Sequence, residues 1–221
     1  MPGTADRGDP LASLTAFERF AFRLTHRMNR GRWKALWSRC QRAIGARWIG
    51  LASSRLLRVH GLEHLDALPA DRPLLLVANH RSFFDFYVIA SVLLRRLRRP
   101  VRLYFPVRGR YFYQSPVGLL INFLIGWWSM FPPLFSSERR RRFDAHALGV
   151  LIELLRDPAT VVGLHPEGRR NLGPDPYQFL PPQPGVGRLI HQARPAVVPV
   201  FVAGLGNDLV RQLAANWLGG E

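Results

Sequence analysis

The sequence predicts an α/β protein with a single mixed central sheet flanked by helices and preceded by a pair of basic amphipathic helices. Of its 221 residues, 48% are hydrophobic and 21% charged, which suffices for one sizeable core. Short apolar runs alternate with helical patterns over most of the chain. We therefore expect a polar tail (1–10), amphipathic helices (11–54) and one α/β domain (55–221).

The amphipathic region is expected to form two helices. Apolar residues recur at helical spacing over 11–28 and again over 33–48, with arginines between them. Tryptophan-containing apolar stripes beside basic residues are typical of helices that lie at a membrane interface, so we interpret both helices as membrane-docking. The alternative is that both stripes pack on the core and leave the arginines in water.

The sheet of the α/β domain is predicted from five short apolar runs. These are residues 56–60, 73–78, 101–105, 160–164 and 196–202. Helical patterns at 84–97 and 138–156 lie between them. Alternation of this kind indicates an α/β sheet.

An uncharged stretch, residues 111–137, is the one candidate for a membrane span. Pro116 and Pro132 bracket only about fifteen continuous residues, fewer than the roughly twenty that a spanning helix needs. We do not interpret it as transmembrane. It forms either a buried helix and strand or a shallow re-entrant element whose Phe123, Trp127 and Trp128 enter lipid.

The charge balance favours a phosphate-bearing partner. Lysine and arginine number 31 against 15 acidic residues, for a formal charge of +16, and Lys34 is the only lysine. A nucleic acid is not expected, because no helix-turn-helix, RNA-binding aromatic signature or zinc spacing is present. Cys40, the only cysteine, excludes an intrachain disulfide, and the polar start lacks a secretory signal. We expect a location on the cytosolic side.

Reactive side chains follow the run at 73–78, where loops beyond the carboxyl ends of strands gather functional groups. His80 precedes Asp85 by five positions across a strand-to-helix turn. The carboxylate can fold back onto one ring nitrogen and leave the other free to take a proton from a hydroxyl. Alternatively, Ser82 and Asp85 only cap the following helix, and His80 is a structural hydrogen-bonding residue.

A second such loop follows the run at 160–164. It places Glu167, Arg169 and Arg170 beyond the sheet, and arginine is suited to binding a phosphate through two hydrogen bonds. Taken alone, this loop could equally be a plain Pro-Glu-Gly turn with surface arginines. Two such loops, each after an apolar strand, favour a functional site.

Together the two loops resemble the glycerolipid acyltransferase family, whose best-known members are 1-acylglycerol-3-phosphate acyltransferases. The matching motifs are Asn79-His-Arg-Ser-Phe-Phe-Asp85 and, about eighty residues later, Pro166-Glu-Gly-Arg-Arg170. Ala196-Val-Val-Pro199 is similar to the family's final Val-Pro strand. The resemblance covers about 59–204.

The resemblance implies a reaction and a set of site residues. A fatty acyl group would pass from an acyl thioester, on coenzyme A or acyl carrier protein, to the free hydroxyl of a lysophospholipid. The acceptor expected first is 1-acylglycerol 3-phosphate, in phospholipid biosynthesis. His80 and Asp85 would be catalytic. The expected substrate-binding residues are Asn79, Ser82, Glu167, Gly168, Arg169, Arg170, Arg108 and Pro199.

The implied partners are membrane lipids and the acyl donor, and no cofactor or metal is expected. The protein would then lie at the cytoplasmic face of a membrane as a peripheral or monotopic protein. The apolar segment 111–137 could also guide the acyl chain.

The motifs depart from the family pattern in three ways. Arg169 stands where the family has threonine. The middle motif, 126–135, lacks its usual arginine, which leaves Arg139, Arg108 or Arg110 as substitutes. Family chains also continue past the Val-Pro strand into another strand, so we expect the domain to lack its C-terminal end.

These departures leave other functions open. The acceptor could be another lysolipid, for example lyso-ornithine lipid, or the fold could be a lipid-binding module without catalysis. A hydrolase is the nearest enzymatic rival, but the chain has no Gly-x-Ser-x-Gly elbow for a serine nucleophile.

Overall fold

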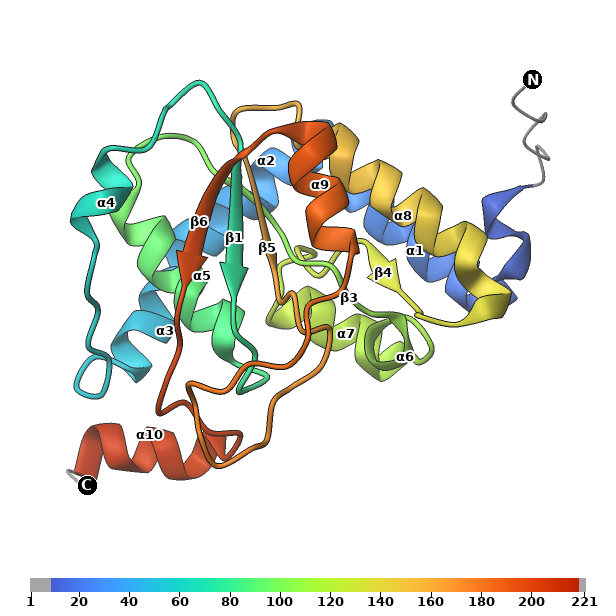
Figure 1. Ribbon diagram of the computed structural model, residues 1–221. Helices are drawn as coiled ribbons and strands as arrows, with labels where there is room; N and C mark the ends of the chain where they lie inside the picture. Colours follow the sequence, from blue (N-terminus) through green and yellow to red (C-terminus); the bar gives the residue numbers. More distant parts are fainter. Residues whose placement is uncertain (1–8, 219–221) are drawn as a thin grey trace.

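A parallel sheet with helices on both faces forms the centre of the protein (Figure 1). The structure, a computed structural model, describes residues 9–218, so most of the expected polar tail and the chain after 218 lie outside the described residues. The strand order is β2-β5-β1-β6. The bounds are β1 Leu74–Ala78, β2 Arg102–Tyr104, β5 Thr160–Leu164 and β6 Ala196–Val200. The α/β class is confirmed, although every pairing among the described strands is parallel, where we expected a mixed sheet.

The register brings the carboxyl ends of three strands to one edge. Leu74 of β1 lies opposite Val161 of β5 and Ala196 of β6, and the strands run in the same direction. The Leu-Leu-Leu-Val-Ala sequence of β1 is apolar throughout because helices cover both faces of the sheet. The loops that carry the predicted motifs therefore leave the sheet at the same edge.

Each face of the sheet has its own core. Leu75 and Val162 face a cluster that includes Leu14 and side chains of α1, α8 and α9. Leu74 and Leu103 face the opposite cluster, together with side chains of α5. The helices concerned are α1 Ala16–Met28, α5 Asp85–Arg96, α8 Arg141–Leu154 and α9 Gly185–Ala193.

The N-terminal region forms the expected helices. α1 begins at a capping box between Thr15 and Glu18. α2 (Gly31–Cys40) continues through a π-helical turn into α3 (Ala46–Ala52). Most of the α1 stripe packs on the core, where Ala21 is buried, but Phe20 of the same stripe is more than half exposed. Trp48 of α3 is also about half exposed. Membrane docking of either helix therefore stays a prediction.

Most of the remaining predicted elements are present. α5 matches the expected helix at 84–97, and a 3-10 turn (Glu138–Arg140) followed by α8 matches 138–156. The strand predicted at 56–60 is wrong. Its Leu56 and Val59 are exposed, and without a neighbouring strand an apolar run cannot form a ladder.

The uncharged segment forms short elements around the sheet edge. These are α6 Gly109–Phe112, α7 Pro116–Leu124, and β4 Pro133–Leu134 paired with β3 Val107–Arg108. Trp128 is buried, whereas Leu120 and Leu124 of α7 are more than half exposed. Across residues 9–218, no helix combines the length and apolar character needed to cross a membrane. α4 (Glu63–Asp66) and α10 (Leu209–Leu218) complete the fold.

Candidate active site

Two loops at the carboxyl edge of the sheet build the site, one after β1 and one after β5. The Glu167 carboxylate joins them by accepting hydrogen bonds from the backbone N–H of His80 (3.0 Å) and of Leu180 (3.0 Å). The backbone N–H of Asn171 donates to the His80 carbonyl oxygen (2.7 Å). Glu167 is only 4% exposed, so its main contacts are with the protein itself.

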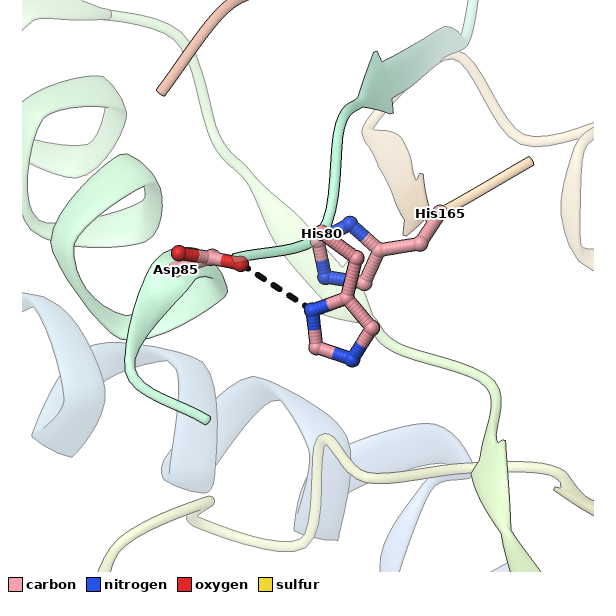
Figure 2. Close-up of side chains that lie close together, drawn as sticks. All are labelled: His80, Asp85 and His165. Carbon is pink, nitrogen blue, oxygen red and sulfur yellow. Dashed lines mark hydrogen bonds and ion pairs between the residues drawn. The ribbon is translucent and has the colours of Figure 1, made fainter. Parts of the chain in front are cut away.

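His80 and Asp85 form a hydrogen-bonded pair. The distance from His80 Nδ1 to Asp85 Oδ2 is 3.0 Å, and Figure 2 shows the other ring nitrogen of His80 on the side away from Asp85. The backbone N–H groups of Arg81 and Ser82 donate to the same Oδ2 at 2.8 and 2.9 Å. Because a carboxylate only accepts, His80 Nδ1 carries the proton and Nε2 presents a lone pair. The geometry is that of an oriented general base.

His165 stacks directly on His80. The ring centroids are 3.8 Å apart and the planes differ by 7° (Figure 2). His165 Nδ1 lies 3.0 Å from the Ala78 carbonyl oxygen, which can only accept, so this nitrogen is the donor. Burial, followed by the neighbouring His80, lowers the pKa of His165 to about 4. His165 therefore stays neutral near pH 7 and fixes one face of the His80 ring.

The turn at Glu167-Gly168 requires glycine. Gly168 has φ of +65°, and a Cβ there would lie 3.0 Å from the side chain of Gln183. The Arg108 guanidinium donates two hydrogen bonds to the Gly168 carbonyl oxygen, at 3.2 and 2.9 Å. Arg108 thus holds the loop and also lines the cavity beside it.

Asn79 and Ser82 make structural contacts. The Asn79 side chain bonds both backbone groups of Val202, donating to the carbonyl oxygen (2.8 Å) and accepting from the N–H (2.7 Å). The Ser82 hydroxyl is fully buried and donates to the Gly206 carbonyl oxygen (2.6 Å). Both side chains tie the His80 loop to the segment that follows β6.

A cavity of about 470 Å³, called here the reaction cavity, adjoins His80. Its basic lining residues are Arg108, Arg169 and Arg170, and its inner wall is apolar. The Arg170 guanidinium lies over the Phe83 ring, 3.9 Å from the centroid. The structure thus brings the arginines of the second loop and His80 to one cavity.

Several predicted residues do not line the reaction cavity. Pro199 is on the edge strand β6, opposite Val77, and is not among the residues described around the reaction cavity. Of the proposed substitutes for the missing middle-motif arginine, Arg108 lines the cavity, whereas Arg110 and Arg139 are absent from its described lining.

Three side chains of the site carry atoms that can act as metal ligands. Donor atoms of His80, Asp85 and His165 lie within 4.8 Å of one another. The lone pairs of an imidazole lie in the plane of its ring, and the two stacked rings are nearly parallel, so their lone pairs do not converge on one point. In addition, Nδ1 of each ring donates a hydrogen bond. The three side chains fit a hydrogen-bonded base better than a set of converging ligands.

His165 is the site residue to which the sequence assigned no role. The only sequence signal was its place directly after the run at 160–164, because its contact with His80 depends on the pairing of β1 with β5, in which Val77 lies opposite Leu164. His165, the first residue after β5, therefore lies beside Ala78 and close to the start of the His80 loop.

Comparison with known proteins identifies one related family. A family model described as Acyltransferase matches residues 56–203, about two thirds of the chain, and this range contains both loops and their strands. A search of curated proteins found no match.

Proposed function

Because the chain belongs to the acyltransferase family, we propose that it transfers a fatty acyl group from an acyl thioester to the free hydroxyl of a lysophospholipid. The donor is an acyl-coenzyme A or an acylated acyl carrier protein. The first candidate acceptor is 1-acylglycerol 3-phosphate. The observation that carries this proposal is the His80–Asp85 pair at the reaction cavity, with basic side chains in the same lining.

The proposed chemistry needs no covalent acyl-enzyme. His80 Nε2 takes the proton of the acceptor hydroxyl while that oxygen attacks the thioester carbonyl carbon. The C–S bond then breaks, an ester forms, and the thiolate leaves with the proton returned by His80. Asp85 holds the imidazole and stabilises the imidazolium that forms in between. Such a base contributes about 10²- to 10⁴-fold, and positioning of the two substrates supplies more.

The charges of the cavity support a phosphate-bearing substrate. Arg169 and Arg170 line the reaction cavity, and arginine binds phosphate oxygens through paired hydrogen bonds. The formal charge of +16 would attract both an anionic donor and an anionic membrane. Neither class of donor is favoured over the other by these groups.

We also propose that the protein works on the cytoplasmic face of a membrane as a peripheral protein. Exposed apolar side chains on α7, including Leu120 and Leu124, support this proposal, as does half-exposed Trp48 of α3. Both helices lie toward the end of the molecule where the strands end (Figure 1). A lysolipid would then be presented on the side that holds His80.

Thiol release from a long-chain acyl-coenzyme A, measured with and without 1-acylglycerol 3-phosphate, tests the proposal. Lipid extraction identifies the product. We expect release that depends on the acceptor and a diacyl product. Release that is equally fast without acceptor would instead indicate a hydrolase. If this acceptor fails, lyso-ornithine lipid and other lysolipids, with an acyl carrier protein donor, are tested next, and failure of all of them would indicate a lipid-binding module.

A further inference from the structure

A second cavity, about 230 Å³ in volume and called here the apolar cavity, lies beside the reaction cavity. α3, the loop after it, α5, the end of α7 and the segment after β6 enclose it. None of its described lining residues carries a charge. The polar exceptions are Ser53, Gln212 and the hydroxyl of Tyr87. The chemistry of the lining suits a hydrocarbon chain.

Only a thin wall separates the two cavities. Tyr87 lines both, and its hydroxyl lies 3.6 Å from the sulfur of Met130, which lines the reaction cavity. Phe83 lines the reaction cavity, while the next residue, Phe84, lines the apolar cavity. Both belong to the turn that joins His80 to Asp85. The turn that carries His80 and Asp85 therefore borders both cavities, and Tyr87 is the side chain that a lipid tail would pass between them.

The rim of the apolar cavity is itself apolar and exposed. Trp48 and Leu56 are 51% and 48% exposed on one side, and Leu124 and Ile125 are 58% and 44% exposed on the other. These residues are continuous with the exposed apolar surface of α7. An opening of this kind admits a chain from a lipid phase without passing it across a charged surface.

Two hydrocarbon chains meet in the proposed reaction: the chain being transferred and the chain that a lysophospholipid already carries. The reaction cavity holds the basic side chains near His80 and a deep apolar wall that includes Leu151 and Leu189. We propose that the apolar cavity binds the hydrocarbon chain of the lysophospholipid acceptor. This inference rests on the proposed function.

Acceptor chain length tests the proposal directly. The wild-type protein is assayed with acyl-coenzyme A and a series of 1-acylglycerol 3-phosphates of increasing chain length, each below its micelle concentration. We expect the KM of the acceptor to fall about fourfold per added methylene until the cavity is full, which corresponds to about 0.8 kcal/mol per buried methylene.

Two substitutions fill the apolar cavity from different helices. Ala52→Phe on α3 and Val88→Phe on α5 each enlarge a lining side chain. Both are expected to abolish the fall in KM with acceptor length and to leave the dependence on donor chain length unchanged. Ala145→Phe, at an exposed position of α8, is the matched control and should behave as the wild type. Thermal unfolding verifies that the variants fold.

A binding measurement keeps the test independent of turnover. Trp48 and Trp127 line the cavity, so a lysophosphatidic acid with a brominated chain should quench their fluorescence. Ala52→Phe should remove this quenching. The proposal would be overturned if quenching were unchanged in Ala52→Phe. It would also be overturned if the filled variants lost the dependence on donor chain length and kept the dependence on acceptor chain length. If the wild type transfers to no lysolipid, the proposed function fails, and the quenching result alone decides whether this cavity binds a chain.

Discussion

The stacked, neutral His165 makes folding stability depend on pH in a way that can be calculated. Its pKa is about 4 in the folded protein, against 6.5 in an unfolded chain, chiefly because of burial. Between these pH values the unfolded chain binds a proton that the folded protein does not, so the free energy of unfolding falls as the pH drops. The lowered pKa of His165 corresponds to roughly 3.5 kcal/mol in all, of which about 3 kcal/mol is lost by about pH 4.5.

His165→Phe isolates this contribution. Phenylalanine keeps an aromatic ring between His80 and Phe86, whose ring centroid lies 4.1 Å from that of His165, but it cannot take up a proton. Urea unfolding of the wild type and the variant at about pH 7 and about pH 4.5 gives the two changes in free energy of unfolding. We expect the variant to lose less stability on acidification, by up to about 3 kcal/mol. His191→Phe, at an exposed position of α9, should lose as much as the wild type. Equal losses in His165→Phe and the wild type would refute the reasoning.

The site, the surface and the core each yield a further prediction. Arg170→Gln should raise the KM of a phosphate-bearing acceptor about tenfold or more in steady-state assays, because a charge-assisted hydrogen bond contributes about 1.5–3 kcal/mol. Leu120→Glu combined with Leu124→Glu should weaken cosedimentation with anionic vesicles, whereas Phe20→Glu on α1 should not if α7 is the docking surface. Lys34→Met should lower the free energy of unfolding by about 1–3 kcal/mol in urea titration, since the buried Lys34 Nζ donates to Asn29 Oδ1 and to the Leu103 carbonyl oxygen, and both acceptors would lose this donor.

The sequence predicted the strands that carry the site because their apolar runs are long enough to be buried on both faces. β1 and β5 fall within the predicted runs, and the family resemblance identified the loops that follow them. The run at 56–60 is less apolar, because it contains Arg58 and His60, and among the described residues no strand pairs with it. Pairing partners are a property of the tertiary structure, and a local pattern does not contain them.

Side-chain roles within the loops were harder to predict than the loops themselves. Asn79 and Ser82 belong to the matching motif, yet each is engaged by the backbone beyond β6, more than a hundred residues later. Glu167 likewise bonds backbone groups of two separate segments. A motif places a residue at a loop, but the fold decides whether its polar atoms face the substrate or the protein.

The most direct test of the central claim is acceptor-dependent thiol release by the wild type, His80→Ala and Asp85→Asn, assayed with a long-chain acyl-coenzyme A and 1-acylglycerol 3-phosphate. If His80 is the base and Asp85 orients it, both variants should remain folded and bind the acceptor, and turnover should fall by about 10²- to 10⁴-fold. Acceptor-dependent transfer at the wild-type rate by folded His80→Ala would contradict the account.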